Sequence, residues 1–198
     1  MKLPNTAHTS RPWRIHDLTR DFILEDVWEL PTPGGPDDFS SLVRLFAGGD
    51  TANNPSRVAR GLFALRWKLG QWFGWDDPDS AVGSRVPSLR DRLPADLRGA
   101  PAGPRFTTLP FDSVYLTDDE WAAEMANRTV QTVMHMAWVP DDAGGYHGQM
   151  AVLVKPNGRF GKAYMAAIAP LRYLLVYPPL MRGIGRKWQE DRPQNSFA

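Results

Sequence analysis

The sequence predicts an α+β domain in which an antiparallel sheet packs against a long C-terminal helix. Residues 129–139 alternate apolar and mixed side chains with the period of two that is typical of a strand with unlike faces. Residues 146–154 repeat that alternation after a loop rich in Asp and Gly, which predicts a hairpin. Residues 160–188 form a long, largely apolar segment of helical character, which prolines are expected to kink at 170 and to break at 178–179.

Composition limits the classes of protein to consider. The 198 residues fit one domain, which we place at 17–190, between a flexible arm at 1–16 and a flexible tail at 191–198. The formal charge of +1 and the absence of a basic stripe argue against nucleic-acid binding. Cysteine is absent, which excludes disulfides and thiol chemistry. The first residues lack an apolar run of signal-peptide length, so we expect a cytoplasmic protein.

The elements before the hairpin follow from apolar spacing and turn residues. Residues 17–30 indicate a first strand, and a loop rich in Pro and Gly separates it from a short helix at 37–47. Residues 56–74 carry an apolar stripe at three- and four-residue steps, which predicts a second helix. Residues 76–110 indicate a long crossover loop, with a short edge strand near Val86 and Leu89, that could form a pocket rim.

Four strands are expected after that loop, at 113–116, 120–127, 129–139 and 146–154. Their register can be predicted at the hairpin. If Pro140 lies opposite Tyr146, then apolar side chains meet along one face, because a slip of one residue would send them to opposite faces. The predicted pairs on that face are Met136 with Met150, Met134 with Val152, and Thr132 with Val154.

The C-terminal segment is nearly long enough to cross a membrane, but its composition argues against a span. Arg172 lies near its middle, and an arginine there costs about 2.5–3.5 kcal/mol on insertion scales. The predicted sheet also needs a cover, and this segment is the best candidate to supply one. Contact with an anionic membrane surface stays an alternative because basic residues flank the segment, namely Lys162, Arg182, Arg186 and Lys187.

The order of these elements resembles the helix-grip fold of the SRPBCC superfamily, which includes START domains, Bet v 1-like proteins and polyketide cyclases. In that fold a curved antiparallel sheet wraps around the final helix, and two short helices follow the first strand. The sequence also resembles a bacterial family of unknown function, chiefly in its C-terminal half. The resembling stretches are 109–111, 126–130, 135–138, 150–158, 163–165 and 176–178. The resemblance implies a ligand cavity between sheet and helix but no shared catalytic set.

The candidate catalytic residues are those that could move protons in such a cavity. His135 lies in the middle of a predicted strand and could act as an acid or base, or make one structural hydrogen bond on the outer face. Glu124 shares a strand face with Glu120, and a carboxyl buried beside Trp121 would have a raised pKa. Tyr164 on the long helix could donate to a carbonyl oxygen, or simply pack in the core.

Further residues are candidates for ligand contacts. Arg128 could bind a carboxylate or pair with a neighbouring glutamate, and Arg172 would need a carboxylate partner if it is buried. Large apolar side chains would line the cavity or fill an ordinary core. These candidates are Trp121, Met134, Met136, Trp138, Met150 and Tyr177.

Two hypotheses of function come from these observations, together with the membrane or partner-binding alternative. One is an enzyme that holds a small hydrophobic, polyketide- or aromatic-like molecule and catalyses a cyclisation, dehydration or related proton transfer. The other is a non-catalytic carrier or sensor of a lipid-like ligand. No metal or cofactor is expected, because the four histidines lack metal-ligand spacing and no glycine-rich phosphate loop follows a strand. The oligomeric state cannot be predicted from these patterns.

Overall fold

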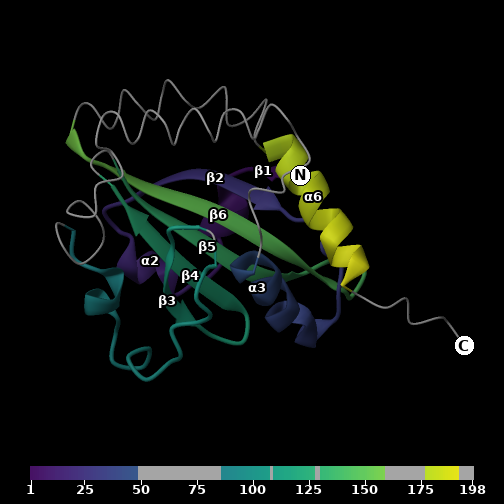
Figure 1. The fold of residues 1–198 in the computed structure, drawn as a ribbon, viewed down its shortest axis with the longest axis horizontal. Helices are drawn as coiled ribbons and strands as arrows, with labels where there is room; N and C mark the ends of the chain where they lie inside the picture. Colours follow the sequence, from purple (N-terminus) through teal and green to yellow (C-terminus); the bar gives the residue numbers. More distant parts are fainter. Residues whose placement is uncertain (49–85, 108, 128–129, 159–176, 192–198) are drawn as a thin grey trace, which may run out of the picture.

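The computed structural model describes residues 1–48, 86–107, 109–127, 130–158 and 177–191. It has the predicted α+β class and a helix-grip-like arrangement: an open antiparallel sheet of six strands, in the order β1-β2-β6-β5-β4-β3, and a C-terminal helix (Figure 1). The strands are β1 (Lys2–Leu3), β2 (Ile23–Glu29), β3 (Asp112–Leu116), β4 (Glu120–Ala126), β5 (Val130–Pro140) and β6 (Tyr146–Pro156).

The predicted hairpin register is confirmed along the whole of β5 and β6. Pro140 lies opposite Tyr146, and Met136 lies opposite Met150. The turn is stabilised by Asp141, whose Oδ1 accepts hydrogen bonds from the amides of Ala143 and Gly145, at 2.9 and 2.8 Å. Burial of one apolar face therefore fixed the register that the alternation predicted.

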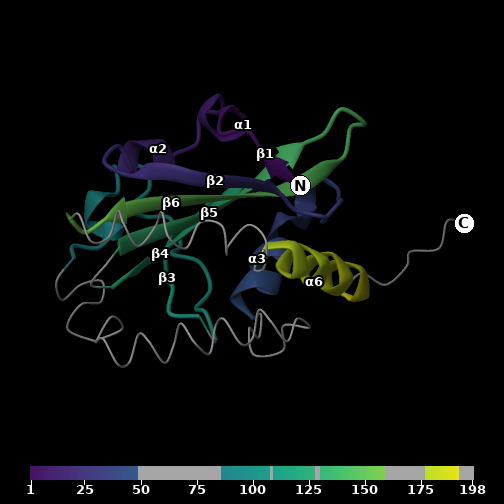
Figure 2. The ribbon, with the colours of Figure 1, turned by 90° about the horizontal axis from the view of Figure 1, so that it is seen from above.

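Helical segments cover both sides of the sheet. Figure 2 shows α1 (Thr6–Thr9) and α2 (Ile15–Leu18) on one side, and α3 (Phe39–Ala47) and α6 (Tyr177–Glu190) on the other. We call the first side the histidine face; its central side chains are His135, Glu120, Glu124 and Gln131. We call the second side the aromatic face; its central side chains are Trp121, Met134, Met136, Trp138 and Met150.

The N-terminal segment differs from the flexible arm that we predicted. Lys2 and Leu3 pair with β2, and the Asn5 side-chain amide donates to the carbonyl of Leu24 at 3.0 Å. His8 is only 1% exposed, and Trp13 only 8%. Backbone pairing and the burial of these rings outweigh the entropy that a loose arm would retain. Residues 1–16 are thus part of the packed structure.

Several other predicted elements concern residues that the structure does not describe. The helix at 56–74, residues 160–176 of the long helix and the tail from 192 all lie outside the described residues. In α6, Pro178 and Pro179 lie at the beginning of the described helix. Leu89 begins the short 3-10 helix η4 (Leu89–Arg92) rather than an edge strand, because the Ser88 hydroxyl caps the amide of Arg90. Among the described helices, none is long and apolar enough to cross a membrane.

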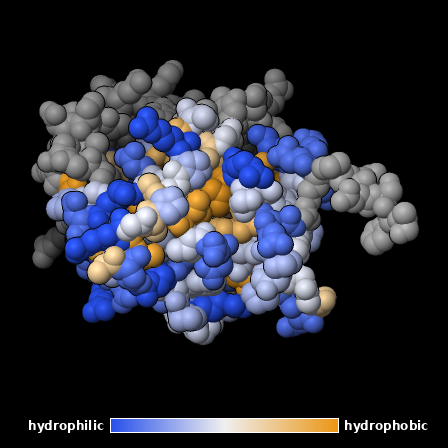
Figure 3. Space-filling view, turned by 90° about the horizontal axis from the view of Figure 1, so that it is seen from below, coloured by the Kyte–Doolittle hydropathy of each residue, from blue (hydrophilic) through white to orange (hydrophobic). Residues whose placement is uncertain are grey.

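Two large apolar clusters, one on each face, form the core. The cluster on the histidine face joins Trp13, Ile15 and Leu18 to the loop residues Leu89, Leu93 and Leu97. The cluster on the aromatic face joins the sheet to α3 and α6. Seen from below, the described surface is mostly polar, with a narrow apolar strip (Figure 3). Among the described residues, the large hydrophobic side chains that are exposed are Met1 and Ile23.

Candidate functional site

The most unusual feature of the histidine face is a buried carboxylate–histidine pair. His135 on β5 is fully buried, and its Nε2 lies 2.8 Å from Oε2 of Glu120, which begins β4. The hydroxyl of Tyr115 on β3 donates to the same oxygen at 2.9 Å. The backbone amide of Arg14 donates to both carboxylate oxygens, at 2.9 and 3.1 Å. Three separate segments therefore fix one carboxylate in place.

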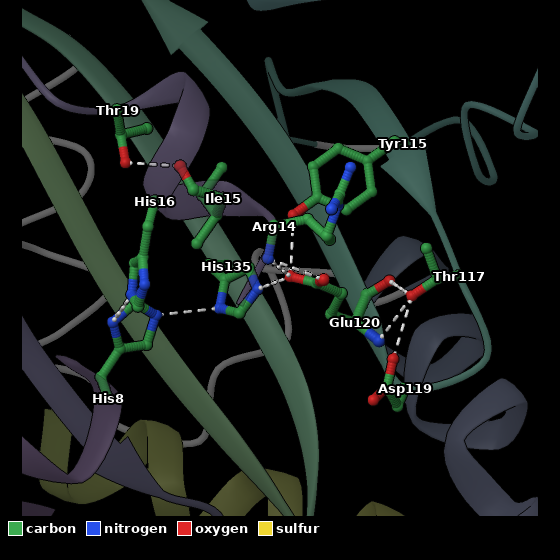
Figure 4. Close-up of polar contacts among 10 residues, drawn as sticks. All are labelled: His8, Arg14, Ile15, His16, Thr19, Tyr115, Thr117, Asp119, Glu120 and His135. Atoms are coloured by element: carbon green, nitrogen blue, oxygen red, sulfur yellow. Dashed lines mark hydrogen bonds and ion pairs between the residues drawn. The ribbon is translucent and has the colours of Figure 1, made fainter. Parts of the chain in front are cut away.

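Two further histidines extend this pair toward the surface (Figure 4). Nε2 of His8 lies 3.1 Å from Nδ1 of His135, and Nε2 of His16 lies 3.2 Å from Nδ1 of His8. The rings of His8 and His135 meet edge to face, with centroids 5.0 Å apart. His16, His8, His135 and Glu120 thus form a continuous row, which we call the histidine row.

The environment sets the protonation of the row. Burial, followed by the charges of His135 and His16, lowers the pKa of His8 to about 3, so His8 is neutral at pH 7. Burial works against ionisation of Glu120, but the hydrogen bond and the charge of His135, together with the hydrogen bonds from the Arg14 amide and Tyr115, outweigh it and lower its pKa. Burial raises the pKa of Tyr115, which therefore stays a donor. Glu120 is therefore an ionised acceptor, held by donors from His135, the Arg14 amide and Tyr115.

A pocket of about 470 Å³ lies beside this carboxylate. That volume is within the range of small-molecule sites. Thr117, Asp119 and Glu120, between β3 and the start of β4, form one wall. The N-terminal segment and the loop before β3 supply the rest, namely Arg11, Pro12, Trp13, Arg14, Asp96 and Leu97. The Arg14 guanidinium is paired with Asp96, whereas Arg11 makes no ion pair within the described residues. The loop at 76–110, predicted as a possible pocket rim, supplies Asp96 and Leu97.

Glu124, predicted as a catalytic acid, lies on the same face but is held by structural contacts. Its Oε1 accepts hydrogen bonds from the Ser88 hydroxyl at 2.6 Å and from the Leu89 amide at 2.9 Å. Its Oε2 accepts from the Gln131 side chain at 3.1 Å. Burial raises its pKa, as predicted, in spite of these bonds. Glu124 anchors η4 to the sheet, and it is not among the residues that line the pocket.

Several residues were predicted to contact a ligand. Those among them that the structure describes lie on the aromatic face, away from His135. Trp121 is fully buried, stacks on Phe106 with centroids 5.0 Å apart, and donates to the Ser113 hydroxyl at 3.2 Å. Trp138 packs near Trp188 and donates to the carbonyl of Gly35 at 2.9 Å. Met134, Met136 and Met150 are buried in the same cluster.

Tyr177 joins α6 to the sheet on this aromatic face. Its hydroxyl lies 3.0 Å from Oδ2 of the buried Asp26, and its ring lies 4.5 Å from that of Trp28. The remaining predicted site residues, Tyr164, Arg128 and Arg172, lie outside the described residues. Among those described, no group of three or more His, Asp or Glu is arranged to hold a metal ion. The three histidines of the row face one another in series and do not converge on one point.

A family of proteins of unknown function, DUF2867, matches residues 18–179. The chain belongs to this family. No curated protein and no solved structure matches the chain significantly. The DUF2867 match includes Tyr115, Glu120 and His135, whereas His8 and His16 precede it. The row therefore joins residues from inside and outside the matched region.

Sequence reasoning singled out His135 but missed the side chains that it contacts, Glu120 and His8. Glu120 was considered only beside Glu124, because both share a strand face and period alone cannot separate them. His8 and His16 were missed because residues 1–16 were expected to be loose. A usable signal was present: Trp13, Ile15 and Leu18 are large apolar residues in a segment otherwise rich in polar ones. Such residues seldom all stay in water.

Proposed function

We propose that the protein binds a small, partly aromatic, anionic molecule in the pocket beside Glu120 and transfers a proton to or from it. The observation that supports this most is the position of Glu120, an ionised, almost fully buried carboxylate in a pocket wall. Ionised carboxylates are rarely buried without a function or a full set of partners. Among the described residues, Oε1 accepts only the Arg14 amide, which leaves it capacity for a ligand donor.

The pocket walls indicate the class of ligand. Trp13 and Leu97 offer apolar surface, which suits a ring. Arg11 offers a guanidinium that makes no ion pair within the described residues, which suits a carboxylate or another oxyanion. A ligand with both features would place a carbon between the cation and Glu120. A carboxylate there can take a proton from a carbon next to a carbonyl.

A relationship to the SRPBCC superfamily is part of this proposal, supported by the order of elements and the antiparallel sheet with a C-terminal helix. The resemblance implies a ligand between the sheet and the last helix, which corresponds to the aromatic face. The pocket beside Glu120 lies on the other face. Chemical shift mapping with a ligand therefore distinguishes the two sites, because the affected residues would surround either Glu120 or Met136.

Binding is tested with 2-naphthoate and, as an uncharged control, 2-naphthalenemethanol. We expect naphthoate to shift the NMR signals of Arg11, Trp13 and Arg14. Arg11→Gln should weaken naphthoate binding about tenfold, as expected for loss of one charge-assisted contact, and leave the alcohol unaffected. Shifts confined to the aromatic face, or naphthoate binding that Arg11→Gln leaves unchanged, would contradict the proposed pocket.

Proton transfer is tested with phenylpyruvate in D2O, by following deuterium uptake at the carbon next to the ketone. We expect Glu120→Gln to lower the protein-catalysed rate by about a hundredfold or more, the usual contribution of a general base. Glu124→Gln is the matched control, because Glu124 lies on the same strand face but does not line the pocket. Equal loss in both variants, or none in Glu120→Gln, would remove the assigned role of Glu120.

A further inference from the structure

The histidine row connects the pocket wall to the outside of the molecule by a second route. Exposure increases along it, from His135, which is fully buried, through His8, which is 1% exposed, to His16, which is half-buried. Glu120 at the inner end lines the pocket. A group in the pocket and a group near solvent are thus joined through two buried rings, independently of the pocket mouth.

The atoms of the row face one another in a repeating order. Nε2 of His16 faces Nδ1 of His8, Nε2 of His8 faces Nδ1 of His135, and Nε2 of His135 faces Glu120 (Figure 4). A neutral imidazole has one donor and one acceptor nitrogen. If all three rings carry the proton on Nε2, every contact in the row is satisfied, and each donor faces inward. The ionised state of Glu120 selects this direction, since a carboxylate can only accept.

We propose that His16, His8 and His135 form a proton relay between solvent and Glu120. The proposal rests on the proton-transfer function proposed above, because it supplies the route by which Glu120 exchanges protons while a ligand fills the pocket. His135 and His8 act through Glu120 and are relay residues that do not touch the ligand. The contacts of 3.2, 3.1 and 2.8 Å are hydrogen-bond distances throughout.

Each step of the relay conserves protons. Water or a buffer acid gives a proton to Nδ1 of His16, and the proton on Nε2 of His16 moves to Nδ1 of His8. The proton on Nε2 of His8 moves to Nδ1 of His135, and the proton on Nε2 of His135 moves to Oε2 of Glu120. One proton enters, one arrives, and all three rings end neutral. The row returns to its starting state when the same steps run in reverse, so that Glu120 gives a proton back to His135 and His16 releases one from Nδ1 to solvent.

The surroundings of the histidine row favour the passage of a proton over a lasting positive charge on one of its rings. Burial and its histidine neighbours hold the pKa of His8 far below 6.5, so a lasting imidazolium in the middle of the row is disfavoured. At the outer end, burial and the charge of His135 lower the pKa of His16, while the charges of Glu120 and Asp17 act against this. At the inner end, Glu120 faces His135, Tyr115 and the Arg14 amide. The inner end of the row is thus an ionised carboxylate that can accept a proton and release it again.

The test needs no ligand, because the relay predicts rapid exchange of buried ring protons with water. The exchange rates of the Nε2 protons of His8 and His135 are measured by NMR in the full chain labelled with ¹⁵N. Couplings across the N–H···N bonds should place the protons on Nε2 of His16 and His8. We expect His16→Gln to slow exchange at His8 and His135 by about tenfold or more, because exchange then requires local opening.

Two comparisons separate a relay from a structural role. His147→Gln is the matched control, since His147 lies on β6 outside the row, and its exchange rates should equal those of the natural protein. In His16→Gly, added imidazole should restore exchange, which a lost packing contact would not allow. Hydrogen exchange of the backbone amides in β5 reports whether each variant stays folded. If a His16 variant does not fold, His16→Asn is used in its place.

Unchanged exchange in a folded His16→Gln protein would overturn the relay, as would protons on Nδ1 of His8 at neutral pH. Either result leaves the naphthoate and phenylpyruvate experiments unaffected. Conversely, failure of those experiments with normal, His16-dependent exchange would remove the proposed function and leave the proton route itself in place.

Discussion

The two faces of the sheet share the same strands but satisfy their buried polar groups in different ways. On the aromatic face, polar atoms of large rings bond to the nearest backbone or hydroxyl group, as Trp138 does with Gly35 and Trp121 with Ser113. On the histidine face, polar side chains form hydrogen bonds mainly with other side chains, and the histidine row runs from the sheet into the N-terminal segment that covers it. Polar networks inside a protein are costly unless every member is satisfied, so they are rarely retained without a use.

This difference corrects the idea of a single cavity formed by all the predicted residues. His135 and Met136 are neighbours in sequence, and the pleat sends them to opposite sides of the sheet. A ligand beside Glu120 cannot also touch Met134 or Met150. Among the described residues, the catalytic candidates and the ligand-contact candidates therefore lie on opposite faces of the sheet. The histidine face combines a pocket with acid–base groups whose pKa is shifted.

The strongest way to break the comparison is to open the aromatic face. Trp121→Ala removes a fully buried ring, and we expect it to lower the free energy of unfolding by about 3–5 kcal/mol. Urea denaturation measures this loss. If the two faces are independent, a folded Trp121→Ala protein should keep the proton positions of the histidine row, as measured by ¹⁵N NMR. Loss of the row along with the core would show that the faces depend on each other.

Acid pH should weaken the histidine face selectively. The folded pKa of His8, about 3, lies below its value of about 6.5 in the unfolded chain. The unfolded state therefore binds more protons below pH 6.5, and stability falls as pH decreases, by up to about 1.4 kcal/mol per pH unit from this residue. Urea denaturation at pH 6.5 and 4.5 should reveal the slope.

The window between pH 6.5 and 4.5 separates His8 from Glu120. The pKa of Glu120 is lowered from 4.5, so its stabilising contribution is present above that value and is lost only at lower pH. His8→Phe keeps an aromatic ring but removes the titration, and its stability should change less over this window than that of the natural protein. An equal slope in both proteins would contradict a neutral, buried His8.

The smallest expected effect concerns the bond between α6 and the sheet. Tyr177→Phe removes the hydroxyl that lies 3.0 Å from Asp26 and should destabilise the fold by about 1–3 kcal/mol, since a buried carboxylate loses a partner. Tyr146→Phe is the control, because the half-buried Tyr146 stacks on Trp138 and has no side-chain hydrogen bond within the described residues. Thermal or urea unfolding compares the two, and equal losses would indicate that the Asp26 contact contributes little.

The sequence predicted the sheet better than it predicted the site. Alternation gave the strands and the register of β5 with β6, because a face of Met and Trp can be buried in one register only. It could not rank Glu120 above Glu124, since both have the same period and differ only in their partners. Ser88 and Leu89 donate hydrogen bonds to Glu124, whereas Glu120 lines a pocket. Partners supplied by distant loops leave no local pattern in the chain.

The N-terminal segment was the largest error, and its cause is physical. Short helices such as α1 and α2 have little intrinsic stability, so their sequence carries a weak signal. What holds them is burial of Trp13, Ile15 and Leu18 against a sheet made of residues far along the chain. Prediction from a local window cannot include such contacts.

The same contacts determine the order in which parts of the chain can fold during its synthesis. His8 meets His135 across 127 residues, and a ribosome adds residues at about 5–20 per second, so His8 waits roughly 6–25 seconds for its partner. Throughout that interval the apolar side of the nascent N-terminal segment has no sheet to cover. The part of the chain that is translated first therefore completes its fold late, and a ribosome that stalls before β5 leaves a product that lacks His135 and cannot form the histidine row.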